Sequence, residues 1–341
     1  MSAEPPREDV ARMLAAAGLP GEFRLTALPG GANNRVYRLD RGGEPLLLKA
    51  YFRHPDDPRD RLGAEFAFCR FAWDCGLRCL PRGVACDRRL DLGLYEFIDG
   101  GTLSAAQIGR QEIQQAADFY RELNRHKSLP AARTLPPGSE ACFSLDEHLA
   151  CVQRRIERLV RLEDATPLGR EAAALVRGGL APAWERVRTR AAAEAAGLGL
   201  ALGEPLPPRD ECLSPSDFGF HNAILATDGR LRFIDFEYAG WDDPAKTVCD
   251  FCCQPAVPVP ECHAQDFARA VLSDLSDPEW HGRRIALLLP VYRVKWCAIM
   301  LNDFLPADGR RRSFARQSQG AEDRRRAQLE KAGDALRHIE R

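Results

Sequence analysis

The sequence predicts an α+β chain of two lobes: a small antiparallel β lobe with one helix, and a larger, mostly α lobe that contains a β hairpin. Three observations predict this fold class. Short apolar runs separated by Gly, Pro and charged residues fill residues 23–52. Long helix-like stretches begin near residue 104. Within the second part, ILATDGRLRFI (224–234) places Asp-Gly between two apolar runs, which is a strong hairpin signal.

The first lobe is predicted to span residues 1–98. Pro29-Gly30-Gly31 and the charged, Gly-rich stretch 40–44 separate its first strands, and Asp99-Gly100-Gly101 stops its last one. The expected elements in chain order are a short amphipathic helix at 7–17, three strands within 23–52, a helix at 59–76 that Gly76 ends, and a strand at 94–98.

The second lobe, residues 99–341, is predicted to be mainly helical. Ser144 and Glu147 form a capping-box pattern before the apolar-periodic LACVQRRIERLV. The other expected helices cover 104–126, 169–196, 284–305 and the charged tail after 315.

Composition narrows the class of protein. The 341 residues suffice for two domains, with 45% hydrophobic and 28% charged residues. A net charge of -1 gives no general attraction to nucleic acid. We see neither a signal peptide nor 18 uninterrupted apolar residues, so we expect a cytoplasmic protein with no membrane partner. The 12 cysteines are then expected to be reduced and packed as small apolar groups, rather than to hold a metal.

The hairpin suggests a metal site. With a two-residue turn at Asp228-Gly229, residue 226 faces 231 and Asn222 faces Asp235 at the open end. Directly paired residues have Cβ atoms about 4.5–5.5 Å apart. Amide and carboxylate oxygens are ligands that Mg²⁺ accepts together with water and phosphate oxygens. Asn222 and Asp235 are therefore predicted to hold one Mg²⁺–nucleotide.

Asp217 stands five residues before Asn222. In kinase catalytic loops an Asp five residues before the metal-binding Asn accepts or orients the acceptor hydroxyl. The rival assignment makes Asp217 the metal ligand, but the catalytic Asp would then lie in GLGLALG (197–203), which has no carboxylate. Asp217 is therefore predicted to be the catalytic residue and Asp235 the metal ligand. We interpret the neighbouring His221 as a structural residue of the loop.

PSDFGFHNAIL and FIDFEYAGWDDP resemble the aminoglycoside phosphotransferase and choline kinase superfamily, and the likeness extends over roughly residues 20 to 255. It implies a protein-kinase-like fold and transfer of the γ-phosphoryl group of ATP, with Mg²⁺, to a hydroxyl of a small molecule. The resemblance also implies cofactor-binding residues. These are Gly30, Gly31 and Asn33 in the nucleotide loop, Lys49 on the phosphates with Glu65 as its partner, and Glu96 to Ile98 at the adenine edge.

One position departs from this family. The family usually has His two residues before the catalytic Asp, where it braces the loop, and this chain has Pro215. Proline fixes φ and has no N–H to donate, so the loop must be braced differently. Asp243-Pro244 matches a structural turn of the family, and Asp242 is a candidate contact to a cationic substrate.

Several alternatives stay open. A non-catalytic nucleotide-binding pseudokinase is the main rival, and Pro215 is its best support. A kinase acting on proteins is disfavoured because no extended activation segment follows Asp235. The acceptor is expected to be a sugar, amino sugar or amino alcohol, with 292–304 as one wall of its site. Arg293, Lys295, Asn302 and Asp303 are candidate contacts there, although most are expected to be solvated helix residues. The sequence predicts no oligomeric state.

Overall fold

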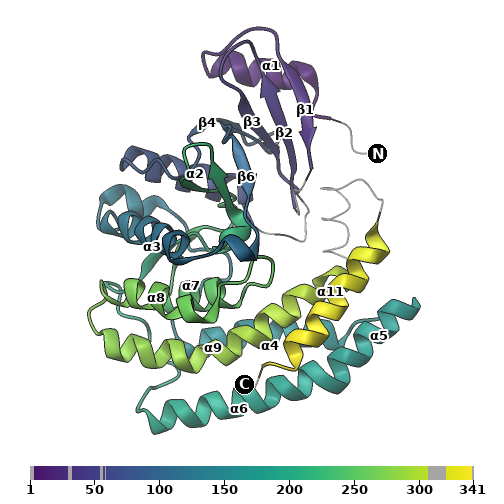
Figure 1. Cartoon of the computed structure of the whole chain (residues 1–341), viewed down its shortest axis with the longest axis vertical. Helices are drawn as coiled ribbons and strands as arrows, with labels where there is room; N and C mark the ends of the chain where they lie inside the picture. Colours follow the sequence, from purple (N-terminus) through teal and green to yellow (C-terminus); the bar gives the residue numbers. More distant parts are fainter. Residues whose placement is uncertain (1–3, 30–32, 54–56, 58, 306–319, 340–341) are drawn as a thin grey trace.

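The computed structural model describes residues 4–29, 33–53, 57, 59–305 and 320–339. A small lobe built on a β-sheet stands above a larger helical lobe, with the first residues in the upper lobe and α11 in the lower one (Figure 1). The predicted α+β fold class and its division into a β-rich first part and a helical second part are confirmed.

The upper lobe contains a five-stranded antiparallel sheet with strand order β1-β2-β3-β5-β4. Its strands are β1 (Arg24–Leu28), β2 (Arg35–Asp40), β3 (Leu46–Ala50), β4 (Gly83–Asp87) and β5 (Leu92–Glu96). Two helices accompany it, α1 (Arg7–Ala16) and α2 (Arg61–Asp74). Strand β4 is not among the strands expected from the sequence, because every residue of GVACD is half-buried and the segment shows no alternation.

The upper lobe has a small core of its own. Val10 and Leu14 of α1 pack on Leu39, Leu48 and Leu94 of the sheet, and all five are essentially fully buried. Full burial of such a side chain is worth about 1.5–3 kcal/mol. The α2 side of the sheet instead joins the large core that continues into the lower lobe. The sheet is thus fixed on one face by α1 and on the other by the rest of the protein.

The lower lobe is built from helices. They are α3 (Arg110–Arg125), α4 (Leu145–Val160), α5 (Pro167–Leu175), α6 (Ala181–Gly197), α7 (Pro244–Cys253), α8 (Glu261–Leu272), α9 (Pro278–Met300) and α11 (Ala321–Leu336). A π-helical turn joins α5 to α6. Short 3₁₀ turns lie at Ala105–Gln107, Pro130–Thr134, Phe220–Asn222 and Leu301–Phe304. The capping pattern before α4 is confirmed, since the Glu147 N–H donates to Ser144 Oγ at 3.3 Å.

Helix α9 is the central element of the lower lobe and contacts α4, α6, α7 and α11. Its stretch Pro278–Phe304 is long and apolar enough to cross a membrane, but 61% of its most apolar window is buried inside the protein. Packing against four helices accounts for this apolar composition.

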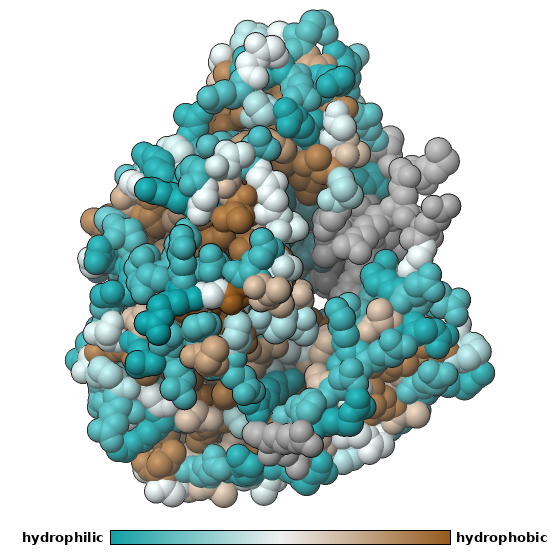
Figure 2. All heavy atoms as spheres, viewed as in Figure 1, coloured by the Kyte–Doolittle hydropathy of each residue, from teal (hydrophilic) through white to brown (hydrophobic). Residues whose placement is uncertain are grey.

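On the face shown in Figure 2, hydrophilic residues cover most of the surface and hydrophobic ones are scattered among them.

The described part of the chain forms two further small sheets in addition to the five-stranded one. One has strand order β6-β8-β9, with β6 (Gly100–Thr102), β8 (Ala223–Ala226) and β9 (Leu231–Phe233). The other pairs β7 (Cys212–Ser214) with β10 (Gly240–Asp242). The lobes are tied together behind the hairpin, where the Phe233 N–H donates to the Cys79 carbonyl at 2.7 Å.

The predicted hairpin exists, but its predicted register is wrong by one residue. Ala223 pairs with Phe233, and the Ala226 N–H donates to the Arg230 carbonyl at 3.0 Å. The turn therefore has three residues, 227–229, and not two. Gly229 has φ 77°, the left-handed conformation that closes a three-residue hairpin loop. As a result Asn222 lies opposite Ile234, and Asp235 is one residue further along.

Asp243 anchors the lower lobe below the hairpin. It is fully buried, accepts the Ala245 N–H at the start of α7 at 2.7 Å, and contacts Arg284 and His148. Burial by itself would raise the pKa of Asp243, but the hydrogen bond with His148 and the charge of Arg284 outweigh it, so the pKa lies below its ordinary value. The expected role of Asp243-Pro244 as a structural turn fits this geometry.

Asp243→Asn is therefore expected to lower the free energy of unfolding by about 3–5 kcal/mol at pH 7, because Arg284 stays buried without its counter-charge. The ionisation of Asp243 stabilises the fold above its unfolded pKa of about 3.9, and this contribution is lost as pH falls through the depressed folded pKa. Urea unfolding should show the gap between wild type and variant narrowing by roughly 1 kcal/mol at pH 3. Asp323→Asn, on exposed α11, is the control. A gap that is constant with pH would contradict the assignment.

Candidate active site

Lys49 lies at the centre of a charged cluster between the lobes. Strand β3 carries it, and its Nζ donates to the two Glu65 oxygens at 2.9 and 2.7 Å and to Asp235 Oδ1 at 2.5 Å. Glu65 comes from α2 and Asp235 follows β9. Three segments that are far apart in sequence thus meet at one ammonium group, and the predicted pairing of Lys49 with Glu65 is present.

Burial and charge act in opposite directions on this cluster. Burial would lower the pKa of Lys49, but the carboxylates of Asp235 and Glu65 outweigh it, and the pKa lies above its ordinary value. Burial raises the pKa of Glu65 against the opposing effect of Lys49. Tyr51 also donates its hydroxyl to Glu65 Oε2 at 2.6 Å. Lys49 therefore stays an ammonium group that is fixed in direction by two carboxylates.

Asn33 and Asn34 connect the predicted nucleotide loop to the lower lobe. Asn33 Nδ2 donates to Glu237 Oε1 at 2.6 Å and to the Tyr238 hydroxyl at 3.1 Å, and Asn34 Nδ2 donates to Glu237 Oε2 at 2.6 Å. Gly30 and Gly31, the predicted phosphate-binding glycines, lie outside the described residues. The described end of this loop is thus held over the cluster by two amide–carboxylate bonds.

Sequence reasoning missed Glu237. Its carboxylate is 2% exposed and stands two residues after Asp235, with Arg61 Nε 3.8 Å away. Burial, with the nearby charge of Asp235, raises the pKa of Glu237. The available signal was a charged residue next to the buried Phe236 in IDFEYA. Its partners are more than 200 residues away in sequence, so no local spacing could identify them.

The connection between the lobes contains the residues predicted to face adenine. The Glu96 N–H donates to the Arg82 carbonyl at 2.9 Å, so that group is already used inside the protein. The backbone of Ile98 makes no hydrogen bond to other backbone groups among the described residues. Contact of a ligand with the Glu96 carbonyl or with the main chain of Ile98 stays a prediction.

Asp217 lies in a tightly shaped loop after β7. Its Oδ1 is 3.2 Å from His221 Nε2, and its carbonyl accepts Asn222 Nδ2 at 2.9 Å. Burial would raise the pKa of Asp217, but the hydrogen bond and charge of His221 lead the opposing effects, and the pKa lies below its ordinary value. Asp217 is thus an ionised carboxylate at neutral pH. His221 orients it, which agrees with the expected structural role of that histidine.

Asn222 and Asp235, the predicted metal ligands, sit on the two adjoining ends of the hairpin. The Ile234 N–H donates to the Asn222 carbonyl at 2.9 Å, so Asp235 follows the residue paired with Asn222. Asp235 has φ 67°, in the left-handed region, and its side chain is 35% exposed. One amide oxygen and one accessible carboxylate suit Mg²⁺, which keeps water and phosphate oxygens as its other ligands. No contact between these two side chains is observed, so the shared site stays a prediction.

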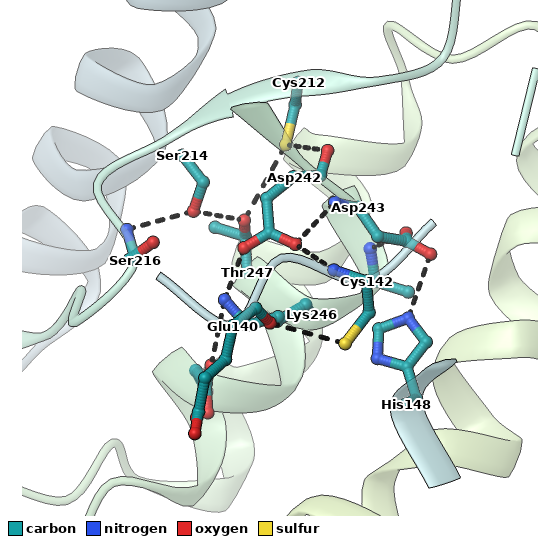
Figure 3. A network of polar contacts seen from close by, with 12 residues as sticks. Glu140, Cys142, His148, Cys212, Ser214, Ser216, Asp242, Asp243, Lys246 and Thr247 are labelled. Atoms are coloured by element: carbon teal, nitrogen blue, oxygen red, sulfur yellow. Dashed lines mark hydrogen bonds and ion pairs between the residues drawn. The ribbon is translucent and has the colours of Figure 1, made fainter. Parts of the chain in front are cut away.

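A chain of hydroxyl groups replaces the missing histidine brace (Figure 3). The Ser216 N–H donates to Ser214 Oγ at 3.0 Å, Thr247 Oγ1 donates to the same oxygen at 2.9 Å, and Cys212 Sγ lies 3.8 Å from Thr247 Oγ1. Strand β7 and helix α7 thus hold the residue before Asp217. The brace is uncharged, and it works with Pro215 because it needs no side-chain donor at that position.

The side chains expected around the acceptor are mostly part of the core. Asp242 is fully buried, and it contacts Lys246 and accepts the Cys142 N–H at 3.1 Å, so the suggestion that it meets a cationic substrate is wrong. Lys295 is buried as well and donates to both Asp250 oxygens at 2.9 and 2.8 Å. Asn302 and Asp303 are also buried, so these three are not the solvated helix residues that were expected.

The cysteines behave as expected in the described structure. All 12 are free thiols, and six of them are buried. No group of three or more His, Cys, Asp or Glu side chains positioned to hold a metal occurs among the described residues. The oxygen pair at the hairpin stays the predicted metal site.

A lysine between two acids, a loop Asp beside an Asn, and a β lobe over a helical lobe define the protein-kinase-like fold of small-molecule kinases. The sequence profile of the phosphotransferase enzyme family matches residues 24–251. The chain therefore belongs to the phosphotransferase enzyme family, which confirms the resemblance seen in the sequence. No curated protein sequence matches it.

Solved structures show the same fold at low identity. Spectinomycin phosphotransferase APH(9)-Ia, in complex with ADP and spectinomycin, is 14% identical, with 99% of each chain covered and a TM-score of 0.63. Choline kinase LicA from Streptococcus pneumoniae is 15% identical, covering 97% of this chain and 98% of that one, with a TM-score of 0.58. A choline/ethanolamine kinase family protein from Mesorhizobium loti is 20% identical, covering 98% and 99%, with a TM-score of 0.55.

Ser214→Ala is expected to loosen the catalytic loop, because the Ser216 N–H loses its acceptor at a cost of about 1–2 kcal/mol. Hydrogen exchange of the peptide that contains residues 213–219 should become about 5–30 times faster at that amide. Ser214→Thr keeps the oxygen and should restore protection. Ser273→Ala, an exposed hydroxyl at the end of α8, is the matched control. Unchanged exchange in Ser214→Ala would show that the hydroxyl chain does not hold the loop.

Proposed function

We propose that this protein is an ATP-dependent phosphotransferase that moves the γ-phosphoryl group to a hydroxyl of a small molecule. The observation that carries the proposal is the bonding of Lys49 to both Glu65 and Asp235, with the Asp217 loop on the adjoining hairpin. A buried lysine aimed by two acids from different segments suits the charge of nucleotide phosphates. A purely structural role would not need the second acid to stay accessible.

In this proposal each residue has one task. Lys49 neutralises charge on the phosphates, and Glu65 keeps it in place. Asn222 and Asp235 would hold Mg²⁺, which supplies further neutralisation of the phosphate oxygens when bound. The transition state of phosphoryl transfer is loose, so the protein needs to form no covalent bond to the substrate. Catalysis then comes mainly from positioning the reactants and from electrostatic stabilisation.

Asp217 orients the acceptor hydroxyl and takes its proton. It is ionised at neutral pH, and its Oδ1 is shared with His221 at 3.2 Å, so the second oxygen can face the substrate. His221 acts as a positioning residue that holds the carboxylate through this bond. Nδ1 of His221 is buried without a partner among the described residues.

We propose a sugar, amino sugar or amino alcohol as the acceptor. Solved structures of this fold include enzymes named for spectinomycin and for choline, which are hydroxyl-bearing compounds of this range. The buried ion pair Lys295–Asp250 joins α9 to α7, so neither residue offers a free charge to an acceptor.

The non-catalytic alternative loses its main support. Pro215 suggested that the loop had no brace, but Ser214 and Thr247 supply one. Lys49, Asp217, Asn222 and Asp235 are all present, and a scaffold has no chemical need for the full set. Catalysis is therefore the function that the geometry supports best.

Asp217→Asn is expected to lower the rate of ATP consumption about 10²–10⁴-fold, the usual contribution of a general base, because the amide cannot accept the proton. The measurement is a screen of hydroxylated metabolites for ATP consumption, followed by kcat on the best acceptor. Asp323→Asn is the control and should keep wild-type activity. Equal consumption by wild type and Asp217→Asn with every acceptor would exclude the proposed mechanism.

Asp235→Asn should raise the Mg²⁺ concentration that half-saturates ADP binding by at least about tenfold, since a neutral amide replaces a charged ligand. Calorimetric titration of ADP at a series of Mg²⁺ concentrations measures this, without any acceptor. ADP binding in the presence of EDTA should change far less. If both variant and wild type require the same Mg²⁺ concentration, Asp235 is not the metal ligand.

A further inference from the structure

A cavity lies beside the hairpin, apart from the catalytic cluster. Its volume is about 700 Å³, within the range of small-molecule sites. Three segments form it: the loop after α2 at 76–79, helix α3, and the turn and strand at 230–233. Lys49, Asp217, Asn222 and Asp235 are not among its lining residues, so a ligand bound there would not occupy the catalytic site.

The lining of this cavity is strongly basic. It contains five arginines but only two acids, Asp118 and Glu122, in a chain whose net charge is -1. Each of the three segments contributes to the set, which is Arg78, Arg121, Arg125, Arg230 and Arg232. Concentrating guanidinium groups in one hollow costs electrostatic repulsion, and a bound anion would offset it. Arginine also matches phosphate oxygens with two parallel N–H bonds.

Among the described residues, two of the three ion pairs made by these arginines are exposed, whereas the third, Arg232–Asp228 at 2.7 Å, has an arginine side chain that is only 20% exposed. Arg125 bonds to Glu122 at 2.6 Å and Arg121 to Asp274 at 2.9 Å, and all four side chains are at least 35% exposed. Exposed pairs of this type contribute only about 0–1 kcal/mol. A multiply charged ligand can therefore take over these arginines at little cost. The Arg230 side chain has no ion pair with any described residue.

The shape of the cavity favours a small ligand over a polymer. Phe119, Leu231 and Phe233 form an apolar floor, and all three are buried. Gln115 is held at the wall, where its Oε1 accepts the Leu231 N–H at 2.8 Å. A hollow with an apolar base and a cationic rim suits a compact molecule that carries phosphate groups on a small organic body.

We propose that this cavity binds a small phosphate-bearing metabolite with at least two negative charges, at a site distinct from the catalytic one. The ligand would join the two lobes, because Arg78 follows α2 whereas Arg125 and Arg230 belong to α3 and the hairpin. The same place already carries the bond from Phe233 to Cys79. Binding there would therefore strengthen the link between the helix of Glu65 and the strand that leads to Asp235.

The test uses the full chain in the presence of saturating ADP. Inorganic pyrophosphate is the probe, and its binding is measured by calorimetry at 50 and 200 mM salt. The double variant Arg125→Ser/Arg230→Ser removes two of the five charges. The matched control is Arg188→Ser/Arg190→Ser on α6, two exposed arginines that each pair with a glutamate, as Arg125 does. We expect saturable binding that weakens with salt and a Kd at least about tenfold higher in the cavity variant, against less than about twofold in the control.

A second measurement keeps the outcome clear if the double variant is unstable. In the wild type, pyrophosphate should slow hydrogen exchange of the segments 76–79 and 230–233 while the control segment 181–197 is unchanged. Absence of saturable binding to wild type, or equal Kd values in the two double variants, would overturn the proposal. Binding is measured without turnover, so neither result depends on the proposed phosphotransferase activity.

Discussion

The ammonium group of Lys49, held between Glu65 and Asp235, is the interaction on which the arrangement of the two lobes depends. A buried lysine without counter-charges would lose its proton, so both acids must reach it for the charge to persist. Glu65 belongs to the upper lobe and Asp235 to the end of the hairpin in the lower one. Closing this charge cluster therefore also sets the position of the strand that carries the predicted metal ligand.

Glu237, two residues after Asp235, also accepts hydrogen bonds from side chains of the upper lobe. The donors are the side-chain amides of Asn33 and Asn34, so the two acids of IDFEYA hold two different segments of that lobe. Lys49 lies on β3, and the two asparagines come just before β2, the neighbouring strand. Charged and amide contacts therefore join the lobes at the Lys49 cluster, and the large apolar core that runs from α2 into the lower lobe joins them behind it.

Sequence alone predicted the β-rich first part, the helical second part and most helices, because hydrophobic periodicity is a local property, and the family resemblance implied the pairing of Lys49 with Glu65. The predicted hairpin register was wrong because it depends on the backbone conformation of one residue. Gly229 adopts the left-handed conformation, which adds one residue to the turn and shifts the register. Sequence reasoning also missed Glu237 and the Ser214–Thr247 brace. Their partners come from distant segments, and only the folded chain brings them together.

Ser216 has a consequence for how this protein tolerates change. It holds φ 63° immediately before Asp217, and its hydroxyl is buried without a partner among the described residues. A left-handed conformation costs a non-glycine residue roughly 1–2 kcal/mol. The chain therefore keeps a locally unfavourable residue beside its reactive carboxylate. Laboratory evolution for heat resistance should reach glycine at this position early, because glycine relieves the backbone strain and removes the unpaired buried hydroxyl.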